Sequence, residues 1–342
     1  MHTTRTRRTR TRRVGNAADG LLSQLTERVI GQPQAMTAIA PYVRMYEAGL
    51  NPEGRPAGVF LLLGPTGTGK TRTVEALAEV LHGNARNLIR IDCGEYQLEH
   101  ETAKLVGAPP GYLGHRETHP VLTQARLAAV TTQHSSLSLV LFDEVEKAAP
   151  SMTRLMLGML DKATLRLGDN NIVNFERSLI FMTSNVGAAG MQALLDRSFG
   201  FGGEATSADN AAPQLDRIAL NAARKAFAPE FLNRVDAIVS YQPLSPNSLE
   251  QILDLQLQDL QNHIDSRLGD RAFRVDITPR GRKFLLGNGA SIEYGAREIK
   301  RAVHKHLTQR LAVLVTEGSI RPGARVRADH GDATDQLSLK AA

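Results

Sequence analysis

The 342-residue sequence predicts an α/β protein with a parallel sheet, followed by a smaller, mostly helical unit. Three observations support this prediction. Short apolar runs alternate with helical patterns over the first two thirds of the chain, as in parallel sheets covered by helices on both faces. A glycine-rich phosphate-binding pattern follows the first of these runs. Beyond Pro243, long amphipathic helical patterns replace the apolar runs.

Five apolar runs are predicted to form the strands of the sheet. Each is rich in branched residues, which favour strands. The runs are GVFLLL (58–63), NLIRID (87–92), LSLVLF (137–142), SLIFM (178–182) and DAIVSY (236–241). Between the first two, TRTVEALAEVL (71–81) is predicted to form a helix.

Two amphipathic helices are predicted in the C-terminal part of the chain. The first, 245–264, begins with a Ser-Pro entry and places its apolar residues on one face, and the second runs from about 296 to 317. We therefore expect a disordered basic tail over 1–18, a large α/β unit over 19–242, a small helical unit over 243–330 and a C-terminal tail over 331–342.

Composition indicates an ordinary soluble globular protein, with 42% hydrophobic and 22% charged residues. The only cysteine, Cys93, excludes an intramolecular disulfide and a cysteine-rich zinc site. No apolar run approaches the roughly 20 residues needed to cross a bilayer, and no apolar segment follows the basic N-terminus to make a secretory signal. We expect a cytoplasmic protein without a membrane partner.

The net charge of +6 is equal to the six arginines of the opening MHTTRTRRTRTRRVGN, so the remainder is formally neutral. The bulk of the chain is therefore not a polyanion binder on charge grounds. Two interpretations of the tail stay open. It contacts nucleic acid or an acidic partner, or it is a solvated, disordered end, which we favour.

The segment GPTGTGKT (64–71) matches the phosphate-binding pattern G-x-x-x-x-G-K-[ST] at every fixed position. Glycines let the backbone fold tightly, so that its N–H groups face phosphate oxygens. Lys70 is predicted to reach the β- and γ-phosphates, and the Thr71 hydroxyl to bind Mg²⁺. The predicted ATP-binding residues of this loop are Gly64, Pro65, Thr66, Gly67, Thr68, Gly69, Lys70 and Thr71.

The segment LVLFDEVEKA (139–148) places two acids directly after an apolar strand. Asp143 is predicted to hold Mg²⁺ through its water shell, and Glu144 to polarise the water that attacks the γ-phosphate. Three further polar residues are candidates: Asn185 after a strand, Arg234 after an apolar helix end and Arg297 at a helix start. Taken alone, each of these three is compatible with a turn or a surface position.

Together these segments resemble the AAA+ ATPases of the Clp unfoldase type, in particular the second ATPase module of ClpA-, ClpB- and ClpC-like proteins. The matching strings keep the family's order and similar spacing from about residue 20 to 328. They are RVIGQ (28–32), GPTGTGKT, GAPPGYLG (107–114), LFDEVEKA, MTSNVG, FAPEFLNRVD and YGAREIKRA. GAPPGY and PEFLNR make the match specific, because a generic phosphate-loop protein would not share them.

The resemblance implies strand order 5-1-4-3-2 and a small helical lid. It implies that Val29 and Ile30 line the adenine pocket, and that Asn185 and Arg297 are the sensor-1 and sensor-2 residues. It makes Arg234 an arginine finger acting on ATP bound by the neighbouring subunit, so hydrolysis needs a homo-oligomeric ring, usually a hexamer. The implied catalytic residues are Lys70, Glu144, Asn185, Arg234 and Arg297.

Two segments bear on the use of the ATP. In Clp-type rings, the tyrosine that matches Tyr112, here between Gly111 and Leu113, projects into the central pore and grips a polypeptide. The alternative is a surface turn whose tyrosine packs locally. The tripeptide Phe199-Gly200-Phe201 resembles the peptidase-docking tripeptide of Clp unfoldases, although phenylalanine at its first position is atypical, and chance is the alternative.

The leading hypothesis is an ATP-dependent protein unfoldase or remodelling chaperone. We expect it to work as a single ring, without the N-terminal substrate domain and the second ATPase module that are usual in large Clp chaperones. The sequence HRETHPVLTQ (115–124) after the pore loop departs from the family and leaves substrate preference open. One alternative is a nucleic-acid-associated AAA+ ATPase anchored by the arginine-rich tail. Another is a regulatory ATPase that assembles complexes without threading a chain.

Overall fold

A computed structural model describes residues 15–107, 120–199, 208–289, 295–331 and 336–341. The large subdomain contains a mixed succession of helices and strands. In chain order they are α1 (Gly15–Arg28), α2 (Pro33–Glu47), β1 (Gly58–Leu63), α3 (Lys70–His82), β2 (Ile89–Asp92), η1 (Cys93–Glu95), η2 (Glu99–Glu101), α4 (Thr102–Val106), α5 (Gln124–Ala129), β3 (Ser138–Asp143), η3 (Val145–Lys147), α6 (Pro150–Lys162), β4 (Thr164–Arg166), β5 (Ile172–Asn174), β6 (Ser178–Ser184), α7 (Ala188–Phe199), α8 (Ala208–Ala226), α9 (Pro229–Leu232) and β7 (Ala237–Ser240).

The central sheet has five parallel strands in the order β2-β3-β6-β1-β7. Numbered as the five core strands along the chain, this is 5-1-4-3-2 read from the β7 edge, which confirms the predicted α/β fold and strand order. The short β4–β5 hairpin forms a separate antiparallel pair between α6 and β6. Strands β1 and β3 are buried along their whole length, because helices cover both faces of the sheet.

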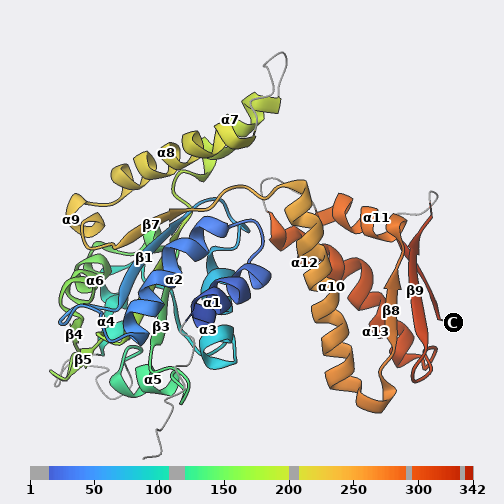
Figure 1. Ribbon diagram of the computed structural model, residues 1–342, viewed down its shortest axis with the longest axis horizontal. Coiled ribbons are helices and arrows are strands. Elements are labelled where there is room, and N and C mark those ends of the chain that lie inside the picture. Colours follow the sequence, from blue (N-terminus) through green and yellow to red (C-terminus); the bar gives the residue numbers. More distant parts are fainter. Residues whose placement is uncertain (1–14, 108–119, 200–207, 290–294, 332–335, 342) are drawn as a thin grey trace, which may run out of the picture.

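Alternate residues of each strand contribute to two hydrophobic cores, one on each face. In β1, Phe60 and Leu62 pack with helices α1, α2 and α3, whereas Val59, Leu61 and Leu63 pack on the opposite face with α6 and α8. The three-layer arrangement is visible in Figure 1, where α7 and the adjoining end of α8 project away from the sheet. Polar residues at the strand ends are therefore brought to one edge of a rigid, doubly covered sheet.

The lid begins after the β7 strand and combines helices with a small sheet. Its elements are α10 (Pro246–Leu268), η4 (Gly269–Arg271), β8 (Arg274–Ile277), α11 (Pro279–Gly289), α12 (Ala296–Val303), the π-helical turn η5 (His304–Thr308), α13 (Gln309–Thr316), β9 (Arg325–His330) and β10 (Leu337–Ala341). The apolar faces predicted for its helices meet in one core that includes Leu253, Ile264, Ile299 and Leu307. Figure 1 shows the lid beside the large subdomain, with β8 and β9 on its far side.

The ends of the chain differ from the predicted boundaries. Helix α1 begins at Gly15, inside the segment assigned to the basic tail. The segment assigned to a C-terminal tail contains β10, which pairs antiparallel with β9 in a three-stranded sheet. Leu337 is buried and Leu339 packs against the lid core, so the period-two pattern of LSLKA forms a half-buried strand. No helix of the described residues is long and apolar enough to cross a membrane.

Candidate active site

A cavity of about 870 Å³ lies where the ends of the sheet strands meet the lid. Such crevices at the carboxyl ends of parallel strands are the usual ligand sites of open α/β sheets. Most of the site residues predicted from the sequence line it: Val29, Ile30, Thr66, Gly67, Thr68, Gly69, Lys70, Thr71, Asp143, Glu144, Asn185 and Arg297. Residues from both subdomains therefore surround one space.

The phosphate loop connects β1 to the N-terminus of α3. Gly64 has φ +144°, and a Cβ there would lie 2.5 Å from the carbonyl oxygen of Tyr241, so no larger residue fits. Gly69 has φ +105° and precedes the first residue of α3. The Thr68 hydroxyl closes the loop by donating to the carbonyl of Pro65 at 2.9 Å. The loop thus directs the N-terminus of α3 into the cavity, where helix N–H groups favour an anion.

Lys70 is only 7% exposed, and its ammonium donates three hydrogen bonds. The acceptors are the carbonyls of Gly64 at 2.6 Å and Pro65 at 2.8 Å, and Oδ1 of Asn185 at 2.9 Å. Burial lowers the pKa of Lys70 to about 8, against the opposing effect of nearby carboxylates, the largest from Glu146. The lysine is thus a buried cation whose partners include a candidate catalytic side chain.

Asp143 ends β3, is 9% exposed, and is held by three neighbours. Its Oδ1 accepts a hydrogen bond from the Thr183 hydroxyl and lies 3.5 Å from the Thr71 hydroxyl. Its Oδ2 pairs with the Arg90 guanidinium at 2.5 Å. Sequence reasoning missed Arg90 and Thr183, although both precede the ends of strands that adjoin β3 in the predicted sheet order.

Glu144 follows with a left-handed backbone (φ +56°, ψ +52°), which is uncommon for a residue with a side chain and marks local strain. Its amide donates to the Thr183 hydroxyl at 3.0 Å, which secures the turn. The two carboxylate oxygens have different partners: Asn185 Nδ2 at 3.2 Å and Lys147 Nζ at 2.5 Å. The strained turn thus aims the second acid toward Asn185, whereas Asp143 faces Thr71.

Asn185 connects the other groups. Its side chain bonds Lys70 through Oδ1 and Glu144 through Nδ2. Its backbone amide donates to Oε1 of Glu146 at 3.0 Å, which orients the residue from a third direction. The structure therefore brings together Lys70, Glu144 and Asn185, which lie on separate segments of the sequence.

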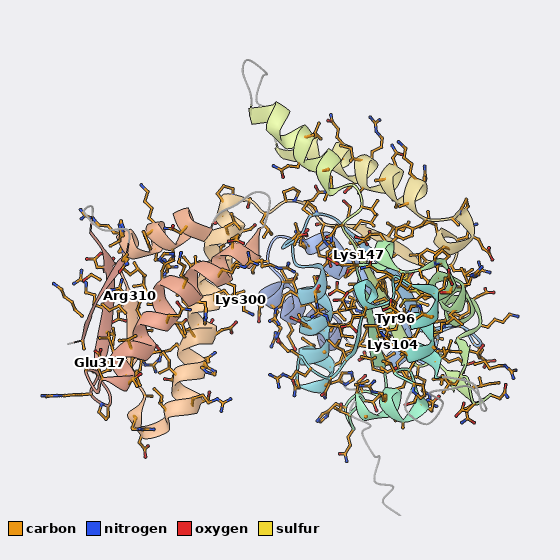
Figure 2. The ribbon with its side chains drawn as sticks, turned by 180° about the vertical axis from the view of Figure 1, so that it is seen from behind. Tyr96, Lys104, Lys147, Lys300, Arg310 and Glu317 are labelled. Carbon is orange, nitrogen blue, oxygen red and sulfur yellow. The ribbon has the colours of Figure 1, made fainter. Side chains whose placement is uncertain are left out.

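The lid contributes the start of α12. The amide of Ala296 donates to the carbonyl of Gly67 in the phosphate loop at 3.1 Å, and a Cβ on Gly295 would lie 2.8 Å from that same oxygen. Arg297 lines the cavity one residue later and lowers the Lys70 pKa further, which reflects its proximity. Lys300 also lines the cavity and was not predicted from the sequence. Figure 2 shows it on the side of the lid that faces the large subdomain.

Gly64 and Pro65 begin the phosphate loop but are not part of the cavity lining, and three further predicted features are not found among the described residues that line it. Arg234 does not line the cavity: it bonds the Glu230 carbonyl at 2.8 Å and pairs with Asp161 at 3.8 Å. Gly111, Tyr112 and Leu113 of the predicted pore loop are outside the described residues. Phe199 is the last residue of α7, and Gly200 and Phe201 are also outside the described part of the chain.

Two family models match the chain. The AAA domain (Cdc48 subfamily) matches residues 55–238, more than half of the chain. The C-terminal, D2-small domain of ClpB protein matches residues 244–328. The chain belongs to the Clp-type AAA+ ATPases. Both halves of this AAA+ module thus have a family counterpart, and the predicted resemblance is confirmed.

Individual relatives agree with this assignment. The AAA+ module is 38% identical over 307 residues to the ATP-dependent Clp protease ATP-binding subunit ClpC of Staphylococcus saprophyticus, covering 90% of this chain and 36% of the relative. The corresponding Staphylococcus aureus protein is 37% identical over 307 residues, with the same coverage of both chains. A structure described as the closed state of Hsp104 with ATPγS and FITC casein aligns with TM-score 0.77 and 27% identity, covering 95% of this chain and 51% of that one. The chain spans about a third of the length of the curated relatives it matches.

Proposed function

We propose that the chain is an ATP-dependent protein unfoldase or remodelling chaperone. The observation that carries this proposal is the meeting of Lys70, Glu144 and Asn185 with the lid residue Arg297 around one cavity at the subdomain junction. Hydrolysis at such a junction changes contacts on both sides and moves the lid. A protein substrate is favoured by the relatives, one named as a protease subunit and the other described with casein.

ATP and Mg²⁺ fit the side chains of the cavity. The Thr71 hydroxyl and the Asp143 carboxylate lie 3.5 Å apart beside the phosphate loop, and oxygen groups of this kind suit a hard divalent cation. We infer that these two residues hold Mg²⁺, directly or through its water shell. When bound, Mg²⁺ neutralises charge on the phosphate oxygens. Lys70 then turns its ammonium to the β- and γ-phosphates, while Val29 and Ile30 pack against the adenine.

The proposed reaction is in-line hydrolysis of the γ-phosphate. A water oxygen bonds to the γ-phosphorus, the bond from that phosphorus to the bridging oxygen breaks, and ADP and inorganic phosphate form. Glu144 accepts the proton that the water loses. Asn185, bonded to Glu144 at 3.2 Å, holds the carboxylate in place. Arg297, from the lid, adds positive charge that stabilises the negative charge developing on the phosphate oxygens in the transition state.

The position of Arg234 supports action across a subunit boundary. It lies outside the cavity of its own chain, where its guanidinium is anchored by Glu230 and Asp161. An arginine that serves a neighbouring subunit needs such an anchorage, because a freely rotating side chain would lose conformational entropy on engagement. We therefore propose a homo-oligomeric ring, usually a hexamer in this family, with each Arg234 facing the next nucleotide. The single-ring arrangement stays a prediction.

The variant Arg234→Ala is expected to assemble but to lose hydrolysis. Arginine fingers contribute about 10³–10⁵ in rate, and alanine leaves the transition-state charge at the boundary without this partner. Steady-state phosphate release measures hydrolysis, and light scattering in the presence of ATP measures assembly. Full activity of the wild-type chain as a dilute monomer would contradict the arrangement across subunits.

The variant Tyr112→Ala is expected to separate hydrolysis from work on a substrate. The residue is outside the phosphate site by sequence, so basal ATP turnover should stay within a few-fold of wild type. Unfolding of a tagged fluorescent protein should fall sharply, because neither Gly111 nor Leu113 offers an aromatic face to the threaded chain. Tyr112→Phe, which keeps the ring, is the matched control. Unfolding by the alanine variant at the wild-type rate would show that Tyr112 only packs locally.

Peptidase docking through Phe199, Gly200 and Phe201 stays a prediction of the sequence. It is tested with the peptidase of a Clp protease from the same cell. Co-purification that is lost in Phe201→Ser supports docking, and co-purification that persists in this variant contradicts it.

A further inference from the structure

Gln32 is a glutamine with no exposed surface that lies outside the cavity lining, at the N-cap of α2. A buried carboxamide is costly unless its donors and acceptor are satisfied. Gln32 follows Val29 and Ile30, the segment expected to face the adenine, and precedes Pro33 at the first turn of α2. Its buried side chain contacts the phosphate loop, because Nε2 donates to the carbonyl of Thr68, a residue of the cavity lining.

The carboxamide of Gln32 uses all of its hydrogen-bonding capacity. A primary amide has two N–H donors and two acceptor lone pairs. Nε2 donates to the carbonyls of Thr68 at 3.1 Å and Gln242 at 2.8 Å. Oε1 accepts from the backbone amide of Gln242 at 3.1 Å and from Gln34 at 3.3 Å. No other side chain of this length offers two donors and an acceptor in this arrangement.

These bonds join the phosphate loop to the connection between the two subdomains. Thr68 belongs to the phosphate loop, and Gln242 lies in the connection between β7 and the first lid helix, α10. Gln32 makes paired bonds to the backbone of Gln242, as a neighbouring strand would. The preceding residue, Gly31, also lies close to the lid. A Cβ at this position would be 2.9 Å from Oγ of Ser248, in the first turn of α10.

We propose that Gln32 is a positioning residue that couples the phosphate loop to the lid connection. This inference rests on the proposed function, because it assumes that the cavity binds nucleotide. A displacement of the phosphate loop on binding is passed to Gln242 through one rigid amide, and from there to α10. Coupling of this kind is reciprocal, so a variant that breaks it weakens both the lid response and the nucleotide affinity.

The test uses Gln32→Met, which keeps the length of the side chain and removes all four hydrogen bonds. Dyes on Lys104→Cys in the large subdomain and Glu317→Cys in the lid, residues labelled in Figure 2, report lid movement by energy transfer. Cys93 is buried and does not compete for the dyes. Labelled chains are diluted into excess unlabelled chain, so that only movement within a subunit is seen. At saturating ADP, we expect less than half of the wild-type change in transfer, and at least about a fivefold weaker ADP affinity.

Gln261→Met is the matched control. Gln261 makes the same pair of backbone bonds, to Phe273 at 2.9 Å and Val275 at 3.1 Å, but within the lid and away from the nucleotide. Both variants are expected to lower the melting temperature, and only Gln32→Met should lose lid response and affinity. An unchanged response and affinity in Gln32→Met, or an equal loss in Gln261→Met, overturns the proposal.

Three outcomes distinguish a failure of the coupling role from a failure of folding or of nucleotide binding. If Gln32→Met does not fold, Gln32→Asn retains the amide on a shorter side chain, and the same losses in that variant support coupling while wild-type behaviour overturns it. If the wild-type chain binds no ADP, the proposed function fails. If the wild type binds ADP and its lid responds, a normal Gln32→Met refutes only the coupling role.

Discussion

Glu144→Gln is expected to bind ATP and to hydrolyse it about 10²–10⁴-fold more slowly, the range that a positioned general base contributes. The amide keeps the shape of the side chain but cannot accept the proton of the attacking water. Its oxygen can still accept the hydrogen bond that Asn185 Nδ2 donates at 3.2 Å. Binding of a fluorescent ATP analogue and steady-state phosphate release, measured on the same sample, separate the two effects.

The matched control for this variant is Glu146→Gln. Glu146 is two residues away, and its Oε1 accepts from the Asn185 amide at 3.0 Å, a bond that the glutamine oxygen can also accept. We expect this variant to retain turnover within about tenfold, a loss of no more than roughly one hydrogen bond. Near-normal turnover in Glu144→Gln together with a large loss in Glu146→Gln would assign the base to Glu146 instead.

Lys70→Ala is expected to abolish tight ATP binding. Lys70 is 7% exposed, and its ammonium is the cation that the phosphate loop itself supplies. Removal of one partner of a buried, hydrogen-bonded charge pair costs about 2–5 kcal/mol, which corresponds to at least about a 30-fold loss of affinity. The carbonyls of Gly64 and Pro65 also lose their donor, so the loop is expected to loosen. Equilibrium titration with a fluorescent ATP analogue measures the loss.

Lys147→Ala is the control for Lys70→Ala. This lysine pairs with Glu144 at 2.5 Å but is 48% exposed and belongs to η3, outside the phosphate loop. Its removal should leave ATP affinity within a few-fold of wild type. If the ATP affinity of Lys70→Ala is within about twofold of wild type, the assignment of this loop as the phosphate-binding site is wrong.

The sequence predicted the central sheet well because its signal is local. GVFLLL is β1 with the same bounds, and the other apolar runs overlap β2, β3, β6 and β7. Strands buried on both faces read as unbroken apolar runs, which few other elements imitate. The site residues that line the cavity were found for the same reason, since the phosphate loop and the acids after β3 are contiguous motifs. Family resemblance added the strand order, the residues Val29 and Ile30, and a role for Arg297, which the local pattern had marked only as a candidate at a helix start.

The residues that the sequence did not reveal act through contacts between distant segments. Arg90 is 53 residues from Asp143, and Gln32 is 210 residues from Gln242. In the sequence, each of these side chains looks like an ordinary polar residue, because only the folded structure brings it beside its partner. The strand β10 was missed because its alternating pattern is short and lies close to the chain end. It forms because β9 provides a partner and the lid core accepts Leu337.

The central claim is that ATP hydrolysis by this chain is used on protein substrates. The most direct measurement is the steady-state ATPase rate of the purified chain with casein, with DNA and with neither. The account predicts that casein raises the rate and that DNA leaves it unchanged. Stimulation by DNA and not by casein would contradict it, and would assign the chain to nucleic-acid-associated ATPases anchored by the arginine-rich tail.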